Sequence, residues 1–240
     1  LGMRVVFRGP FFIGFLLDWI AVGLHWERIK PISKALAMIL VILWSMSWAG
    51  WQVDLMVGLL LMAQIYGLAG DIFLLFSDSW FVWGLGAFLV GHLFYIGLLI
   101  VLNVRAINAG GLIRQPIWVY MLILLGWGAI LAGFYGMLRP VTKHKAISQP
   151  MWIAIQVYAW ILSGMVALSF LTVLVSPVLS WLVLPLPLGA VLFYISDSLL
   201  AYNRFVKDVP LSHLLVHASY HLAQFSLALG FLVIIGVLAF

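Results

Sequence analysis

The sequence contains no cysteine and very little charge. The absence of cysteine excludes disulfides, a thiolate nucleophile and a Cys-ligated metal site. Asp, Glu, Lys and Arg make up 8% of the 240 residues, whereas an ordinary soluble domain carries about 25% charged residues. No Ser/Gly linker, charged tail or low-complexity stretch divides the chain. We therefore expect one domain, residues 1–240, that is not a soluble globule.

The chain consists mainly of apolar residues. Hydrophobic residues make up 66% of the chain, and the mean hydropathy is +1.21. Long apolar runs, without the ten-residue alternation of a membrane barrel, predict helices whose backbone groups are all satisfied within the segment. A span needs about 20 residues. The predicted fold class is an all-α, polytopic integral membrane bundle of eight transmembrane helices. The predicted spans are 10–26, 34–50, 54–76, 80–103, 115–138, 149–175, 186–204 and 212–238.

The formal net charge of +5 comes from Lys and Arg residues that lie between the apolar runs. This placement is typical of membrane topology, so we expect no nucleic-acid partner. Loops on one face carry Arg28, Lys30, Lys34, Arg139, Lys143, Lys145, Arg204 and Lys207; the other face carries Arg4, Arg8, Arg105 and Arg114. Because Lys and Arg are retained on the cytoplasmic side, both termini are expected outside. The expected location is the bacterial inner membrane. A helix break is expected at Arg139-Pro140.

Three aspartates fall at bilayer depth: Asp18, Asp71 and Asp197. A charged group there costs about 2.5–3.5 kcal/mol on insertion scales, so each indicates a functional site. Asp71 and Asp197 both fall in the half of their span nearer the more basic face. Asp18 shares a helical face with His25, and its role stays open.

Two further spans, 80–103 and 212–238, bring His92, Tyr220 and Gln224 to the same depth as these aspartates. Four spans therefore deliver polar groups to one layer. Gly67 and Gly84 lie on the same helical faces and would allow close approach of the helices around this layer.

Several segments together resemble the YhhN-type lysoplasmalogenase family. They are Lys30-Pro31, Gly70-Asp71, the run from Phe81 to Tyr95, the run from Gly189 to Phe205 containing Ser196-Asp197, and Tyr220 with Gln224. The resemblance implies an eight-span fold that hydrolyses the vinyl ether bond of lysoplasmalogens, releasing a fatty aldehyde and a glycerophospho-base. It implies a lysophospholipid partner within the bilayer and no cofactor. The oligomeric state is not predicted.

Vinyl ether hydrolysis starts with protonation of carbon, which creates an oxocarbenium ion that water captures. The catalyst needs an acid and an anion, and two carboxyl groups can supply both, as in glycosidases. We hypothesise that Asp71 and Asp197 are the catalytic pair. In the alternative interpretation they are only structural partners of neighbouring polar groups. The residues expected to orient water or substrate are His92, Tyr95, Ser196, Tyr220 and Gln224.

Lys30 and Arg204 are candidates for holding the lipid phosphate, since both follow spans on the more basic face. In the alternative interpretation they are ordinary topology-determining cations.

Two other functions stay open. His213, His217 and His221 recur every fourth residue, and His217 with His221 has a known zinc spacing, so a zinc-dependent lipid hydrolase is one alternative. A small transporter or channel using Asp71 and Asp197 as a proton relay is the other. Aldehyde release by pure protein in detergent would distinguish the enzyme from the transporter.

Overall fold

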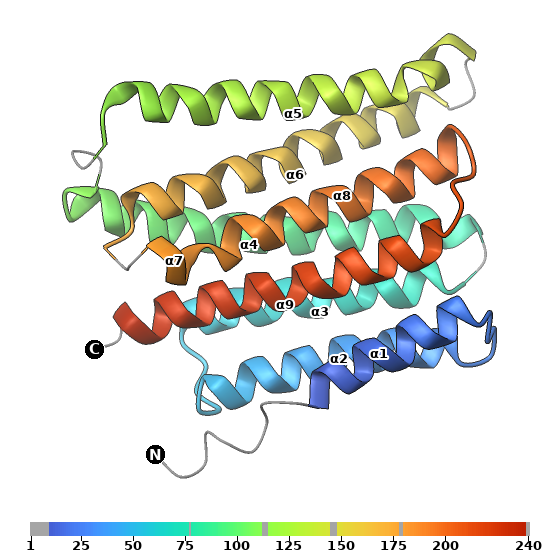
Figure 1. Ribbon diagram of the computed structural model, residues 1–240, viewed down its shortest axis with the longest axis horizontal. Coiled ribbons are helices and arrows are strands. Elements are labelled where there is room, and N and C mark those ends of the chain that lie inside the picture. The colour runs from blue at the N-terminus through green and yellow to red at the C-terminus, as the bar shows by residue number, and fades with distance from the viewer. Residues whose placement is uncertain (1–9, 77, 112–114, 145–147, 178–179, 239–240) are drawn as a thin grey trace.

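The protein is a bundle of long, roughly antiparallel helices (Figure 1), seen here in a computed structural model that describes residues 10–76, 78–111, 115–144, 148–177 and 180–238. Seven helices are long and apolar enough to cross a membrane, which confirms the predicted all-α membrane fold. They are α2 (Lys30–Trp48), α3 (Leu55–Leu74), α4 (Phe81–Asn108), α5 (Ile117–His144), α6 (Gln149–Val175), α8 (Pro185–Phe205) and α9 (Ser212–Leu238).

The first predicted span is shorter than expected. Helix α1 (Pro10–Gly23) has 14 described residues, fewer than the roughly 20 that cross the hydrocarbon core. A 3-10 turn, η1 (Asp78–Trp80), and a single helical turn, α7 (Ser180–Val183), precede α4 and α8 respectively. The fold therefore contains seven full-length spanning helices and one shorter apolar helix among the described residues.

Two predicted boundaries at the basic end are wrong, and proline explains both. Helix α2 begins at Lys30 rather than at residue 34, because Pro31 occupies the first turn, where a missing N–H costs nothing. Lys34 therefore projects from a helix and not from a loop. Helix α5 continues through Pro140 to His144, so the predicted break at Arg139-Pro140 does not occur; membrane helices tolerate an internal proline when other groups satisfy the freed carbonyl.

Helix α9 forms the centre of the bundle, packing against α1, α2, α3, α7 and α8. Glycine allows the closest of these approaches: a Cβ added at Gly189 of α8 would lie 2.7 Å from the backbone nitrogen of Leu227 in α9. Helix α5 lies at the edge, beside α6 (Figure 1). Five polar residues of α9 are consequently buried within the bundle: Ser212, Tyr220, His221, Gln224 and Ser226.

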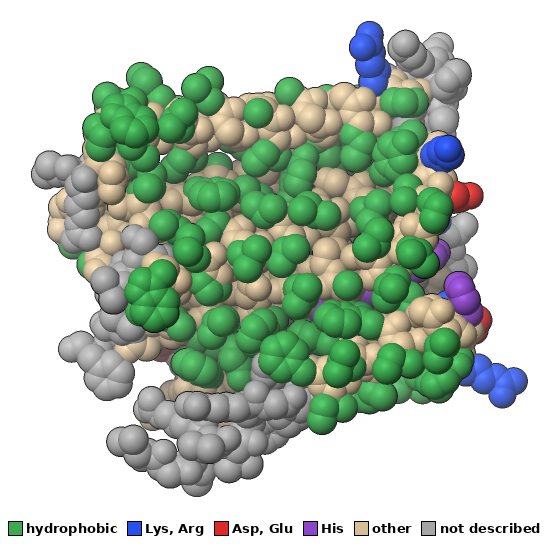
Figure 2. Space-filling view, viewed as in Figure 1, with side chains coloured by type: hydrophobic (Ala, Val, Ile, Leu, Met, Phe, Trp, Pro, Cys, Tyr) green, Lys and Arg blue, Asp and Glu red, His purple; other side chains and the backbone are tan. Residues whose placement is uncertain are grey.

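The surface separates into an apolar belt and a charged end. Figure 2 shows hydrophobic side chains over most of this face, with Lys, Arg, Asp, Glu and His side chains gathered at one end. Helices α1, α3, α5 and α8 end at this end of the bundle, and α2, α4, α6 and α9 begin there (Figure 1). We call it the basic end. The candidate site lies just inside it.

Candidate active site

Asp71 lies in α3, fully buried, and forms an ion pair with Lys34 of α2. The distance from Lys34 Nζ to Asp71 Oδ1 is 2.9 Å, and the Lys34 side chain is 8% exposed. The Tyr220 hydroxyl of α9 faces the same carboxylate. Neither Asp71 oxygen accepts a well-aligned hydrogen bond from any described residue. This buried anion therefore retains capacity to accept another donor.

A chain of hydrogen bonds leads to Tyr220 from the interior. Tyr95 of α4 donates to Gln224 Oε1 at 2.5 Å, and Gln224 Nε2 donates to the Tyr220 hydroxyl oxygen at 3.3 Å. The Tyr220 proton is therefore left for the Asp71 carboxylate. A Cβ at Gly67 of α3 would lie 2.7 Å from Gln224 Nε2 and 3.1 Å from the Tyr220 oxygen. Glycine at this position is what lets α9 bring these groups against α3.

Asp197 lies in α8 and is held by residues of two other helices. Tyr158 of α6 donates a hydrogen bond to Asp197 Oδ2. His92 Nε2 of α4 lies 3.3 Å from the same oxygen and 2.9 Å from the Tyr158 hydroxyl. Because the Tyr158 proton goes to Asp197, the Tyr158 oxygen is an acceptor for His92. Helices α4, α6 and α8 therefore meet at one carboxylate.

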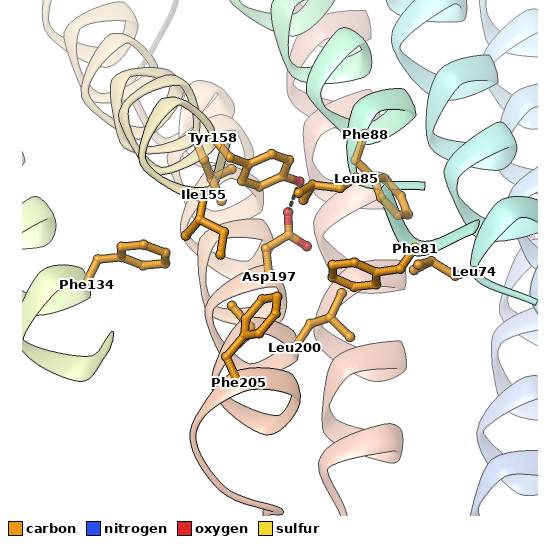
Figure 3. Close-up of a pocket in the computed structure, with 12 residues that line it drawn as sticks. Leu74, Phe81, Leu85, Phe88, Phe134, Ile155, Tyr158, Asp197, Leu200 and Phe205 are labelled. Atoms are coloured by element: carbon orange, nitrogen blue, oxygen red, sulfur yellow. Dashed lines mark hydrogen bonds between the residues drawn. The ribbon is translucent and has the colours of Figure 1, made fainter. Parts of the chain in front are cut away.

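The Asp197 carboxylate projects into a small apolar cavity of about 30 Å³ (Figure 3). One carboxylate oxygen points to Tyr158, and the other points toward the side of the cavity occupied by Phe81 and Leu85. The lining residues are Leu74, Phe81, Leu85, Phe88, Phe134, Ile155, Tyr158, Leu162, Asp197, Leu200, Ala201 and Phe205. Apart from Asp197 and the Tyr158 hydroxyl, these side chains are hydrocarbon. The cavity is chemically suited to an aliphatic chain.

Aromatic rings lie between the Asp71 and Asp197 clusters. The Phe193 ring is 4.5 Å from the His92 ring and 5.3 Å from the Tyr220 ring, measured between centroids. Phe88 contacts both Phe193 and Tyr220. The two carboxylates are therefore neighbours across an apolar partition, and no described residue donates hydrogen bonds to both.

Asp18 of α1 is fully buried in a third cluster. Ser33 of α2 donates to its Oδ1 at 2.8 Å, and His217 Nδ1 of α9 lies 2.7 Å from its Oδ2. His221 Nδ1 is more distant, at 3.8 Å, and accepts a hydrogen bond from Trp19. The partner of Asp18 is thus His217 from the other end of the chain, and not His25.

A polar cavity of about 720 Å³ lies at the basic end, and we call it the vestibule. It is lined by His25, Glu27, Lys30, Pro31, Lys34, Leu74, Leu75, Phe76, Phe81, Leu200, Asn203, Arg204, Ser212, His213, Val216 and His217. Leu74, Phe81 and Leu200 also line the apolar cavity of Asp197. The two cavities therefore share a wall.

The cations of the vestibule rim have identified contacts. Lys30 Nζ lies 2.5 Å from Oε1 of the exposed Glu27. Because Glu27 accepts this hydrogen bond, the pKa of its carboxyl lies below the ordinary value. The Arg204 guanidinium lies 4.8 Å from the centre of the Phe81 ring. Lys30 and Arg204 thus line the vestibule at the ends of their helices, and we call this level of the vestibule its rim.

Of the five residues expected to support the aspartates, the structure places four in the Asp71 and Asp197 clusters. His92, Tyr95, Tyr220 and Gln224 lie in the two clusters as described. Ser196 does not: its hydroxyl donates to the Val216 carbonyl and joins α8 to α9.

Sequence reasoning missed Lys34, Tyr158 and the pairing of Asp18 with His217. Lys34 had a usable signal, since it follows Lys30 by one helical turn once α2 begins at Lys30. Tyr158 is a tyrosine within an apolar span, and nothing in its sequence context distinguishes it.

The zinc alternative gains no support from the part of the chain that the structure describes. No group of three or more His, Asp or Glu side chains in this part is arranged to hold a metal ion. Nδ1 of His217 is occupied by Asp18, and Nδ1 of His221 by Trp19.

The fold and site define a multi-pass integral membrane protein with buried carboxylates between its helices, beside a basic vestibule. The chain belongs to the YhhN family, whose family model matches residues 29–231. This match includes Asp71, Asp197 and every helix except α1 in full or in large part.

Two curated relatives have names that state an activity. The chain is 28% identical over 217 residues to Lysoplasmalogenase TMEM86B of Mus musculus, covering 90% of this chain and 80% of that protein. It is 29% identical over 169 residues to Lysoplasmalogenase TMEM86A of Homo sapiens, covering 69% of this chain and 62% of that protein, which is less than two thirds of its length. No solved structure matches the chain.

Proposed function

We propose that this protein is a lysoplasmalogenase-like hydrolase, which cleaves the vinyl ether bond of a lysoplasmalogen to a fatty aldehyde and a glycerophospho-base. One observation carries the proposal: Asp197 lines an apolar cavity that shares Leu74, Phe81 and Leu200 with the basic vestibule. A lysolipid has an anionic head group and a single apolar chain, so its chemistry matches the linings of the two cavities; the apolar cavity, at about 30 Å³, must widen to admit the chain. The names of the two relatives agree with this activity.

Helical geometry arranges the polar groups in levels along the substrate path. Four residues of a helix rise about 6 Å. Lys30, Arg204 and His213 lie at the rim level; one turn deeper lie Lys34, Leu200 and His217; deeper still lie Asp197 and Tyr220. In this proposal Lys30 and Arg204 hold the phosphate at the rim. The glycerol then lies at the second level, and the vinyl ether reaches the depth of Asp197.

Asp197 is the proposed acid. Asp197 lines the apolar cavity, and in its protonated form it would deliver a proton to the vinyl carbon remote from oxygen. Tyr158 and His92 hold Oδ2, so the other oxygen is the one that faces the cavity. Water then adds to the oxocarbenium carbon and returns a proton to the Asp197 carboxylate. The hemiacetal collapses to the aldehyde and the free glycerol hydroxyl, and the acid is regenerated.

Asp71 is the proposed anion. Its ion pair with Lys34 offsets part of the cost of burying its charge. A fixed negative charge near the reacting carbon stabilises the cation that forms after protonation. The two aspartates therefore act as an acid and a counter-charge, without a direct hydrogen bond between them.

Aldehyde release by the purified protein in detergent tests the proposal, with a 1-alkenyl lysophospholipid as substrate. The wild type should release one aldehyde per lipid cleaved. Asp197→Asn should lose activity by about a hundredfold or more, because an amide cannot supply the proton. Asp71→Asn should also lose activity. Asp54→Asn is the matched control: Asp54 caps α3 at the other end of the bundle by accepting from the Val57 backbone nitrogen, and Asn caps equally well.

Two results would contradict the proposal. One is a correctly folded wild type that releases no aldehyde from this substrate. The other is wild-type activity in both Asp197→Asn and Asp71→Asn.

A further inference from the structure

Asp18, Ser33 and His217 form a hydrogen-bonded cluster beside the vestibule that the proposed mechanism leaves without a role. Both Asp18 oxygens are occupied, Oδ1 by Ser33 at 2.8 Å and Oδ2 by His217 at 2.7 Å. Asp18 itself is fully buried. An ionisable residue at this depth costs free energy, so we expect Asp18 to have a functional role. Its effect must reach the vestibule through His217, which lines that cavity.

The hydrogen bonds identify which ring nitrogen of His217 carries the proton. His221 Nδ1 accepts from the Trp19 indole, which can only donate, so His221 Nδ1 bears no hydrogen. Because an ionised Asp18 can only accept hydrogen bonds, the 2.7 Å contact with its Oδ2 assigns the proton to His217 Nδ1. In its neutral form an imidazole has one N–H, so Nε2 of His217 carries a lone pair. Asp18 thus holds His217 in the tautomer that offers Nε2 as an acceptor.

His217 lines the vestibule. The His217 side chain is 14% exposed and lines the cavity, while its Nδ1 edge is turned to Asp18. Nε2 is the ring nitrogen that the contact with Asp18 leaves available to a ligand. His217 lies at the same level as Lys34 and one turn below His213. Lone pairs repel phosphate oxygens, so this position suits a ligand that donates a hydrogen, namely a hydroxyl group.

We propose that His217, oriented by Asp18, is a specificity-determining residue that accepts a hydrogen bond from the free sn-2 hydroxyl of the lysolipid. This inference rests on the proposed function, because it assigns a subsite of the same lipid path. With the phosphate at the rim and the vinyl ether at Asp197, the glycerol hydroxyl lies between them, at the level of His217. An acylated sn-2 oxygen has no hydrogen to donate. The site therefore selects the lyso form over the diradyl lipid.

Binding of a non-cleavable lipid tests this without catalysis. The probes are a 1-alkyl lysophospholipid and its 2-deoxy counterpart, titrated calorimetrically into the protein in detergent. The wild type should bind the hydroxyl compound about tenfold more tightly or better, the value of one hydrogen bond plus the cost of an unpaired acceptor. His217→Phe should bring this ratio to about one. The control His213→Phe should weaken both probes equally and leave the ratio unchanged.

A second variant distinguishes the loss of the hydrogen bond from misfolding caused by a buried charge. His217→Phe leaves the Asp18 charge buried with Ser33 alone, whereas Asp18→Asn/His217→Phe removes the charge and should show the same ratio of about one. The inference is overturned by a wild type that binds both probes equally, or by a folded variant of either kind that keeps the wild-type ratio. Aldehyde release, measured in parallel, reports on the proposed function separately. A wild type without release but with a His217-dependent ratio contradicts only the reaction, and release with an unaffected ratio contradicts only this inference.

Discussion

Lys34 Nζ lies 2.9 Å from Oδ1 of Asp71, and this buried ion pair joins α2 to α3 directly below the vestibule. Lys34 enters the site because α2 begins at Lys30, with Pro31 in its first turn. In the proposed lipid path, the pair places a cation at the level of the glycerol and an anion behind it. Loss of one partner should cost more stability in this buried pair than in the exposed Lys30–Glu27 pair at the rim.

Breaking the buried pair on one side should be strongly destabilising. Lys34→Met or Asp71→Asn leaves an unpaired charge in the bundle, so each should lower the free energy of unfolding in detergent by about 3–5 kcal/mol. The double variant Lys34→Met/Asp71→Asn should lose less than the sum of the two, while aldehyde release stays low. The control cycle, Lys30→Met with Glu27→Gln, should show no measurable coupling in stability. Additive losses at Lys34 and Asp71 would contradict the ion pair.

Removal of the Tyr158 hydroxyl should lower activity more than stability. Tyr158→Phe deletes the hydrogen bond to Asp197 Oδ2 and leaves His92 in contact with that oxygen. Protonation of the vinyl carbon leaves a carboxylate on Asp197, and a hydrogen bond to a charged group is worth about 1.5–3 kcal/mol, so the rate of aldehyde release should fall by about ten- to a hundredfold. Tyr194→Phe is the control, since the Tyr194 hydroxyl donates to the Ile130 carbonyl. Equal losses in the two variants would argue against a role for Tyr158 at Asp197.

The wall shared by the two cavities should be sensitive to bulk. Leu200→Trp adds volume where the vestibule meets the apolar cavity, so it should raise the KM for long-chain lysolipids and affect short-chain ones less. Leu188→Trp places the same side chain on the same helix at an exposed position. It should leave kinetics unchanged. If Leu200→Trp raises the KM equally for all lipid chain lengths, the lipid chain does not pass this wall.

Glycine at position 67 should be required for the hydrogen-bond chain that ends at Tyr220. In Gly67→Ala the new Cβ would lie 2.7 Å from Gln224 Nε2, so the amide must move and aldehyde release should fall. Gly97→Ala on α4 is the control, because its Cβ would meet nothing within 4 Å. That variant should keep wild-type activity and gain up to about 1 kcal/mol in stability from helix propensity. Wild-type activity in Gly67→Ala would show that Gln224 can shift without consequence.

Much of the site could be predicted because depth along a helix can be read from sequence. Asp71 and Asp197 were expected in one layer with His92, Tyr220 and Gln224, and the 1.5 Å rise per residue suffices for that inference. The hydrogen bonds within the layer could not be predicted in this way. They depend on which helix faces which, and a span that is apolar on all sides carries little information about its neighbours.

The composition and run lengths by themselves determined that this is an all-α membrane protein, because only helices satisfy their own backbone in lipid. They also marked Asp18, Asp71 and Asp197, since a charge in an apolar span is rare for energetic reasons. Only the tertiary structure assigned the partners: Lys34 to Asp71, Tyr158 to Asp197 and His217 to Asp18. Each pair joins different helices, and α9 brings His217 to Asp18 from 199 residues away. Such contacts follow from packing in three dimensions, which no single helix encodes.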